Sequence, residues 1–463
     1  MKLYRGIAFT TAFLFVLLNS LLAQPHLKGH VEIEMKTGLI NCSFSLSNVP
    51  ALEKYSILLN KGMNVKYFKD KAGKLMDYAG HHGGKTNGEA IAYALTDAAN
   101  DTMALPSAFS VEYKGAFPVY ADNDLNVFDY KGIIAFNGQT VRATEQTKWY
   151  PVIYDAANDR LLHDYTYDLT VSIKDGSSIF INGSAPQKKQ KARFTSTKAY
   201  PLLLFAGNYN FLRNGGDYIL NADISQKTAE KIFNNIESIK DVLAANLQLA
   251  FTDNIYLISH KPVNMRPKGS SWGFNTYPSF AFTGLNFEDL ITKEDKFPDH
   301  IYKYYGHEFG HNYFGNNVLS GKLSWFWLES FAEYLSYNVA EDIVGQDYLK
   351  QTLIKQAKQL EGKSFTPLSE VKQREDIDNT YRYVLAPLML KCFEDAFGRE
   401  KMNGVIKSLL HAAKTETLTL EHWKQAALQQ GIPEKDFRAF EKEFVESKDF
   451  KQNIVDAIVK KHS

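Results

Sequence analysis

The sequence predicts an α+β protein in which an all-β N-terminal domain is followed by a mixed and then mostly helical domain. Two observations support this fold class. Up to about residue 205, short runs of β-branched and aromatic residues alternate with turn residues. Beyond that point apolar residues recur at helical spacing. Strands followed by helices, rather than alternating with them, are typical of α+β proteins.

The first residues have the pattern of an export signal. Lys2 and Arg5 supply positive charge, residues 7–22 are almost wholly apolar, and Ala23 is a small residue where cleavage is expected. A membrane anchor is the alternative, which the short apolar run disfavours. We therefore expect a cleaved signal over 1–23 and an exported protein, periplasmic or extracellular. No later segment is apolar enough to span a membrane.

Residues 24–205 are expected to form the β-domain. Strands are predicted around 31–35, 165–171 and 178–181, where β-branched and aromatic residues alternate or cluster. Turn signals such as Asn60-Lys61-Gly62 separate these runs. Many short strands of this kind indicate a sandwich or a similar all-β unit.

Residues 206–463 are expected to form the second domain. Apolar residues at helical spacing predict a helix over 225–249 with Ser225 as its N-cap, and a strand follows at 254–259. From Pro298 onward helices dominate. They are predicted at about 299–315, 327–341, 345–359, 380–397, 400–412, 419–429 and 435–447.

The composition disfavours several classes of protein. The chain has 53 Lys and Arg against 52 Asp and Glu, so no basic excess favours nucleic acid or an anionic membrane as a partner. Its two cysteines, Cys42 and Cys392, are too few for a disulfide scaffold, and the sequence leaves open whether they pair.

The segment His307-Glu308-Phe309-Gly310-His311 is the most informative in the chain. Histidines four residues apart stand on one face of a helix, so both imidazoles can reach one ion. Glu308 lies one step round, where it can touch a water on that ion. Gly306 and Gly310 each weaken the helix by about 1 kcal/mol, and we expect them to admit a neighbouring strand or the substrate. The alternative is an amphipathic helix with two histidines in polar contacts.

A third ligand is expected because a catalytic zinc site uses three protein ligands and an open position for water. Glu329 follows His311 by eighteen positions and lies at the margin of the apolar face of the next predicted helix. A carboxylate buried there needs a partner, which an ion supplies. Glu333, one turn later, could accept the second ring N–H of a ligand histidine. The alternative for both is a solvated helix face.

Two segments resemble the gluzincin peptidases, most closely the aminopeptidase N and leukotriene hydrolase family in a short form without the large C-terminal helical domain. They are HEFGHNYFGNNV (307–318) and WLESFAEYL (327–335). The resemblance implies a thermolysin-like fold for 206–463. The family's Asn before the ligand Glu is missing here, and a loop deletion around Ser320-Gly321 would accommodate the shorter spacing.

Carried over residue by residue, the resemblance implies one zinc ion per chain, bound by His307, His311 and Glu329. It also implies that Glu308 acts as general base on a zinc-bound water.

A helix-opening tyrosine is a second family feature. YVLAPLMLKCFEDAFG (383–398) resembles the family helix whose first Tyr donates its hydroxyl to the oxyanion of the tetrahedral intermediate. This register implies a catalytic role for Tyr383. Tyr381 is the candidate if the helix begins earlier, and packing is the alternative for both.

A third family signature is degraded. The family carries Gly-x-Met-Glu-Asn-Pro before the zinc helix, and its Glu binds the free amine of the substrate. The counterpart here is GFNTYPSFAF (273–282), in which Thr276 takes the place of that Glu. A hydroxyl offers no charge to pair with an ammonium, so exopeptidase and endopeptidase action both stay open. Glu288 and Asp289 are the nearest substitutes.

The sequence thus predicts a zinc metallopeptidase acting on a peptide or protein substrate. Two alternatives remain: a non-catalytic binding protein that keeps the peptidase fold, and a zinc hydrolase of a non-peptide bond. No pattern indicates an oligomeric state.

Overall fold

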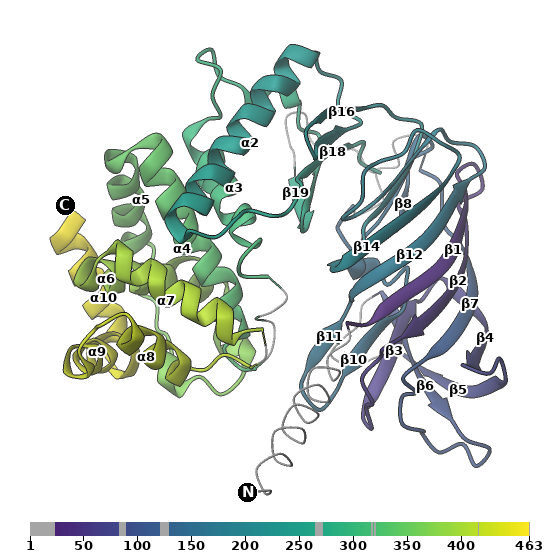
Figure 1. The fold of residues 1–463 in the computed structure, drawn as a ribbon, viewed down its shortest axis with the longest axis horizontal. Helices are drawn as coiled ribbons and strands as arrows, with labels where there is room; N and C mark the ends of the chain where they lie inside the picture. The colour runs from purple at the N-terminus through teal and green to yellow at the C-terminus, as the bar shows by residue number, and fades with distance from the viewer. Residues whose placement is uncertain are drawn as a thin grey trace, which may run out of the picture. The chain divides into compact units, whose positions relative to one another are not determined.

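The computed structural model describes residues 24–82, 89–120, 129–263, 272–315, 318, 321–414 and 416–462 (Figure 1). The expected export signal over 1–23 lies outside these residues. None of the helices in the described part of the chain combines the length and apolarity that a membrane span requires.

The described residues divide into two compact units. The β unit comprises the residues up to Ala156, Leu161–Tyr209 and Val263, and the helical unit comprises Ala157–Arg160, Asn210–Pro262 and the residues from Trp272 onward. Each has its own hydrophobic core.

The β unit is built from short strands. They are β1 (His26–Glu34), β2 (Leu39–Ser47), β3 (Tyr55–Asn60), β4 (Met63–Asp70), β5 (Leu75–His81), β6 (Ala90–Thr96), β7 (Phe109–Ala116), β8 (Ala135–Phe136), β9 (Thr140–Ala143), β10 (Val152–Asp155), β11 (Arg160–Leu162), β12 (Asp164–Ile173), β13 (Ser178–Ile181), β14 (Lys191–Pro201) and β15 (Leu204–Gly207). Among the described strands, one sheet has the order β11-β10-β3-β6-β5-β4-β7-β2-β1-β12-β14 and a second has the order β13-β15-β9-β8.

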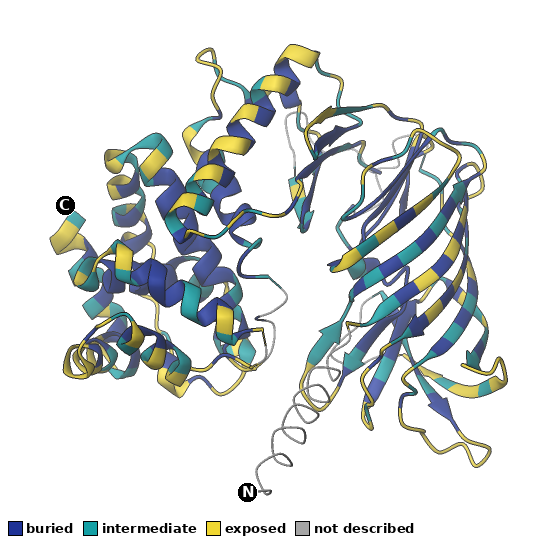
Figure 2. Ribbon diagram, viewed as in Figure 1, coloured by how far each residue is buried: buried dark blue, intermediate teal, exposed yellow. Residues whose placement is uncertain are grey.

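Alternation of side chains explains the large sheet. In β1, Leu27, Val31 and Ile33 are buried while Lys28 and Glu32 are exposed, as expected for a strand with one face on a core. Figure 2 shows the same alternate bands along the neighbouring strands. β1 pairs parallel with β12 and antiparallel with β2. The strands expected at 31–35, 165–171 and 178–181 fall on β1, β12 and β13.

The helical unit contains a smaller sheet and the long helices. The strands are β16 (Phe211–Asn214), β17 (Asp217–Leu220), β18 (Tyr256–His260), β19 (Trp272–Thr276) and β20 (Ser279–Thr283), and the helices are α2 (Gln226–Leu247), α3 (Asp299–Gly310), α4 (Phe331–Val339), α5 (Gln346–Lys358), α6 (Ala386–Phe397), α7 (Arg399–Ala412), α8 (Leu420–Gln429), α9 (Glu434–Glu441) and α10 (Phe450–His462). The sheet has the order β16-β17-β18-β20-β19 among the described strands, so β19 lies at an edge. The α+β class, with an all-β part before a mostly helical one, is confirmed.

The helices match the expected segments with three differences. α3 ends at Gly310 rather than near 315. The expected helices over 327–341 and 380–397 both begin with a wider π-helical turn, η4 (Phe326–Ser330) and η8 (Tyr381–Leu385). α10 was not expected, although Phe450, Ile454 and Ile458 are spaced for one buried helical face.

The structure also tests the expected N-cap of α2 and shows whether the two cysteines pair. Ser225 caps α2 as expected, since its hydroxyl accepts a hydrogen bond from the Thr228 N–H at 3.0 Å. Cys42 and Cys392 are both buried and free. Burial raises the pKa of each thiol, so neither is a reactive thiolate.

Candidate metal centre

Two glycines of α3 bring α4 unusually close. A Cβ on Gly306 would lie 2.9 Å from Val339 Cβ, and one on Gly310 would lie 3.1 Å from Ala332 Cα. No larger side chain fits between the helices at these points. The expectation that the glycines admit a strand or the substrate was therefore wrong, because a helix fills that space. This close approach brings His307 and His311, at the C-terminal end of α3, beside Glu329 of η4 and Glu333 of α4.

His307, His311 and Glu329 gather at this crossing. One ligand atom from each lies within 4.8 Å of the others. Glu329 Oε2 is 3.4 Å from His307 Nε2 and 3.7 Å from His311 Nε2. A tetrahedral zinc with bonds of about 2.0–2.2 Å holds its ligand atoms about 3.3–3.6 Å apart. Two nitrogens and one carboxylate at these separations fit a zinc ion.

A carbonyl or carboxylate oxygen contacts the Nδ1 atom of each imidazole and orients its ring. His311 Nδ1 lies 2.9 Å from the carbonyl oxygen of Phe314, and His307 Nδ1 lies 3.0 Å from Glu333 Oε2. With a proton on each Nδ1, the Nε2 lone pair of each ring is available to bind a metal ion. Glu333 thus takes the place expected for it behind a ligand histidine.

Glu333 is held by a buried network. Lys303 forms an ion pair with its Oε1, and Gln356 Nε2 donates to the same oxygen at 3.3 Å. Tyr337 in turn donates to Gln356 Oε1 at 2.7 Å. These contacts leave Oε2 of Glu333 facing His307 Nδ1 at 3.0 Å, so packing and this ion-pair contact together orient the His307 ring.

The buried carboxylates and imidazoles at the site shift one another's pKa values. Burial alone would lower the pKa of His307, but Glu329 and Glu333 outweigh it and raise that pKa to about 10. Burial alone would raise the pKa of Glu329, but His307 and His311 lower it to about 2. Glu329 is 9% exposed and Glu333 is 7% exposed. A solvated helix face is therefore excluded, and the site favours a cation.

Glu308 faces the sheet. The amide of Asn275, on the edge strand β19, donates a short hydrogen bond to Glu308 Oε2. Phe280 of β20 packs against Phe309 with ring centroids 5.5 Å apart, which anchors α3 on the sheet. The edge strand β19 and the helix α3 therefore meet at the Glu308 carboxylate.

The segment expected to bind a substrate amine offers no carboxylate. Thr276 is 2% exposed, and the strand's contact with Glu308 comes from its neighbour Asn275. Glu288 is occupied elsewhere, because it accepts hydrogen bonds from Thr228 Oγ1 at 2.7 Å and from the Ser225 N–H at 3.2 Å at the start of α2. Glu288 is thus a poor substitute for the missing acid.

The two candidate tyrosines differ in their surroundings. The Tyr383 ring centroid lies 5.7 Å from that of His307, and burial together with the charge of Glu329 raises the pKa of its phenol. Tyr381 is fully buried between Phe365 and Phe450, at 5.8 and 6.3 Å. Only Tyr383 of this pair borders the metal ligands.

Three residues near the centre escaped the sequence analysis. Lys303 lies one helical turn before His307, so its i, i+4 spacing was a usable signal. Asn275 lies within the degraded segment 273–282, and nothing in the local sequence links it to Glu308. Arg382 stacks on Trp325 and Tyr383, a contact that no spacing rule anticipates.

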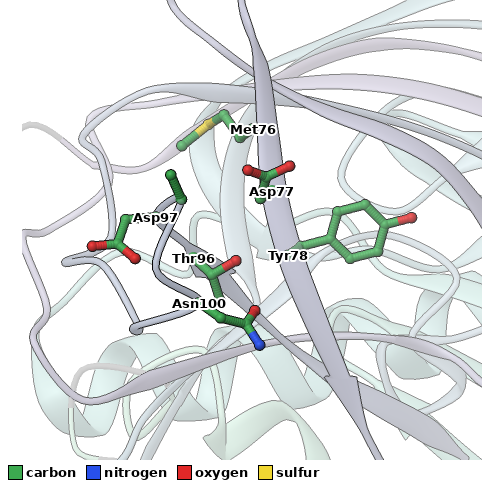
Figure 3. A pocket seen from close by; sticks show the side chains of 7 residues that line it. Met76, Asp77, Tyr78, Thr96, Asp97 and Asn100 are labelled. Carbon is green, nitrogen blue, oxygen red and sulfur yellow. The ribbon is translucent and has the colours of Figure 1, made fainter.

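A hollow lies in the β unit, whereas the residues described above belong to the helical unit. It has a volume of about 390 Å³ and is lined by Met76, Asp77, Tyr78 and the turn after β6 (Figure 3). The Asp97 carboxylate in that turn accepts backbone N–H groups from Ala99 and Asp101, both at 2.9 Å. Its lining has no histidine or cysteine, and we assign it no metal.

Comparison with known proteins agrees with this geometry. Residues 230–452 match the model of the peptidase family M1 domain. No curated protein sequence matches the chain.

Solved structures share the fold. Native LTA4 hydrolase from yeast is 14% identical with a TM-score of 0.60, over 91% of this chain and 67% of its own. The M1 zinc metallopeptidase from Deinococcus radiodurans is 12% identical with a TM-score of 0.57, over 90% and 93%. A mutant of the latter bound to a Tyr-Ser-Ala substrate is 13% identical with a TM-score of 0.58, over 90% and 94%. The resemblance inferred from the motifs is confirmed.

Proposed function

We propose that this chain hydrolyses peptide bonds with one zinc ion held by His307, His311 and Glu329. Residues 230–452 match the model of the peptidase family M1 domain, which supports a zinc metallopeptidase. The donor set carries the proposal. Two imidazole nitrogens and a carboxylate oxygen lie at the spacing of zinc ligands. The buried charges around them favour a cation.

Each residue of the site has a distinct role in the proposed reaction. Zinc supplies a Lewis acid that polarises the carbonyl and acidifies water. Glu308 accepts the proton of the attacking water on its carboxylate and delivers it to the leaving amine. The Asn275 amide holds that carboxylate in place. Tyr383 donates its hydroxyl to the oxygen on which negative charge develops.

The edge strand is suited to an extended substrate. β19 pairs with β20 on one side only among the described strands. A peptide added along the other side would gain main-chain hydrogen bonds and would pass the Asn275–Glu308 contact. The tripeptide bound to the Deinococcus mutant supports a peptide as the substrate class.

We further propose that the enzyme does not require a free N-terminus. An ammonium beside the zinc needs a carboxylate partner to offset its desolvation. Neither Asn275 nor Thr276 provides one, and Glu288 is engaged at α2.

The first experiment combines metal analysis with digestion of a mixed peptide library. The wild type should hold about one zinc per chain and cleave peptides. Glu308→Gln should keep the zinc and lose activity by about 100- to 10,000-fold, because an amide cannot accept the proton. Glu294→Gln, an exposed loop residue, is the matched control and should behave as wild type.

The outcomes separate the alternatives. Wild-type turnover in Glu308→Gln would contradict the mechanism. Zinc without cleavage of any peptide would point to a non-catalytic binding protein or to a hydrolase of a non-peptide bond, which a screen of esters and epoxides resolves.

A second experiment addresses the amine. Matched peptides with free and acetylated N-termini are digested and the products are identified by mass. We expect comparable cleavage of both forms. Cleavage of the free form alone, releasing single N-terminal residues, would show that another acid binds the amine, and Asp289 would be the first to replace.

We also propose export, on the N-terminal sequence alone. Expression of the full chain in a cell with a secretory pathway should yield a mature protein that begins at Gln24, as N-terminal sequencing reads directly. Retention of residues 1–23 on the membrane would favour the anchor.

A further inference from the structure

Two arginines flank one tryptophan beside the metal centre. Trp325 directly precedes η4, which carries Glu329, and Arg382 directly precedes Tyr383. The guanidinium carbon of Arg382 lies 4.0 Å from the centroid of the Trp325 ring and 5.2 Å from that of Tyr383. Arg374 stacks on Trp325 more loosely, at 5.5 Å.

The two arginines differ in their charge partners. Arg374 has the carboxylate of Glu375 at 3.7 Å. Arg382 forms no ion pair with a carboxylate within the described part of the chain, and its hydrogen bond goes to the neutral side chain of Asn379 at 2.5 Å. Stacking on aromatic rings fixes the plane of a guanidinium, which can bind a carboxylate through more than one N–H donor. The Nε of Arg382 is buried and has no hydrogen-bond partner among the described residues.

The position of Arg382 relates this cation to the scissile bond. Tyr383, the next residue, borders His307. Because Arg382 stacks on Tyr383, a substrate carboxylate bound to Arg382 would belong to a residue close to the cleaved bond.

We propose that Arg382 is a specificity-determining residue that binds a substrate carboxylate, supplied by the C-terminus of a short peptide or by an acidic side chain. This inference rests on the proposed peptidase function and narrows its substrate class to peptides with a negative charge close to the cleavage point.

The test uses three tripeptides that differ only in charge: one with a free C-terminal carboxylate, its C-terminal amide, and an amide with aspartate as the last residue. For the wild type we expect kcat/KM to be about 10- to 100-fold higher for a carboxylate-bearing peptide than for the neutral amide, the range of a charged hydrogen bond. If only the peptide with the free C-terminus is preferred, Arg382 binds the terminal carboxylate. If the aspartate-containing amide is preferred equally, Arg382 binds any carboxylate close to the cleaved bond.

The variants identify the residue responsible. Arg382→Gln should bring the ratio between carboxylate and amide peptides to within about threefold, and Arg382→Lys should recover part of it, because an ammonium keeps the charge but lacks the fork. Arg374→Gln removes the other stacked arginine and should leave the ratio at the wild-type value. A merely structural role of Arg382 would lower the rates on all three peptides without changing their ratio, and that result overturns the proposal.

Binding separates this inference from the proposed function. Titration calorimetry of Glu308→Gln with the same peptides reports carboxylate preference without turnover. Cleavage of the library with equal use of carboxylate and amide peptides would refute the role of Arg382 and leave the function intact. If no peptide is cleaved but carboxylate peptides still bind preferentially through Arg382, the peptidase function is refuted and the role of Arg382 stands. If there is neither cleavage nor preferential binding, both the function and the role of Arg382 are refuted.

Discussion

Two buried charge clusters of the helical unit differ in how they are balanced. Lys240 of α2 and Asp217 of β17 pair at 2.6 and 2.7 Å, and Asp217 accepts a further bond from the Ile255 N–H at 2.8 Å. Charges and hydrogen bonds there are matched within the fold. At the α3–α4 crossing, the carboxylates of Glu308, Glu329 and Glu333 lie close together. Of these three, Glu333 pairs with a lysine, Lys303, whereas Glu329 contacts His307 and Glu308 accepts a hydrogen bond from Asn275.

The difference distinguishes a structural cluster from one built for a ligand. Burying a charge is costly unless it is paired. The Lys240–Asp217 pair needs nothing from outside. The buried carboxylates beside two imidazoles favour a bound cation, which we propose to be zinc, whereas the other cluster is neutralised by its own side chains.

We expect the largest effect from replacing the proposed zinc ligands. His307→Ala and His311→Ala should lose zinc and all hydrolysis, and Glu329→Ala should weaken zinc binding strongly, because a catalytic site has only three protein ligands. Metal content after dialysis and rates on a test peptide measure this. Full zinc and full activity in Glu329→Ala would move the third ligand to Glu333.

Breaking the balanced pair should act on stability alone. Lys240→Met leaves Asp217 buried without its cation, and we expect a loss of about 3–5 kcal/mol in the free energy of unfolding with zinc content unchanged. Lys227→Met, an exposed position on the same helix, is the control and should unfold as wild type in urea. A stable Lys240→Met protein would mean that Asp217 obtains its balance elsewhere.

Replacing Tyr383 should affect chemistry alone. Tyr383→Phe removes the proposed donor to the oxyanion and should lower kcat by about 100-fold with little change in KM. Tyr381→Phe should leave kcat unchanged, since that ring lies between Phe365 and Phe450. The reverse pattern would shift the register of η8 by two residues.

Loosening the network behind His307 should have a smaller effect. Glu333→Ala should weaken zinc affinity by about 10- to 100-fold, as for other partners of a ligand histidine. Lys303→Met leaves Glu333 in contact with His307 and should change affinity less. Competition with a fluorescent chelator gives both values, and a larger effect from Lys303 would show that its charge, rather than the carboxylate, organises the site.

The smallest expected effect concerns Asn275. Asn275→Leu keeps the approximate shape of the side chain but removes its bond to Glu308, and we expect kcat to fall about tenfold with zinc retained. Steady-state kinetics on one peptide suffice. An unchanged kcat would mean that packing of α3 alone orients Glu308.

Local sequence patterns were sufficient to predict much of the fold and the first two of the proposed metal ligands. The alternation in β1 and β12 and the capped stripe of α2 are visible in the sequence because each follows from the period of one element. The spacing of His307 and His311 predicts a shared helix face for the same reason. Glu329 required the zinc coordination rule in addition, and Tyr383 required a family resemblance.

By itself the sequence determined the α+β class, the histidine pair and the carboxylates that follow it. Only the tertiary structure decided that Asn275 meets Glu308, that Glu288 is engaged at α2, that Tyr383 rather than Tyr381 borders His307, and that the two cysteines stay apart. The physical reason is that periodicity fixes which side chains share a face, whereas packing between distant segments fixes which faces meet. At this centre, Gly306 and Gly310 allow α4 to approach α3, and that approach brings the carboxylates to the histidines.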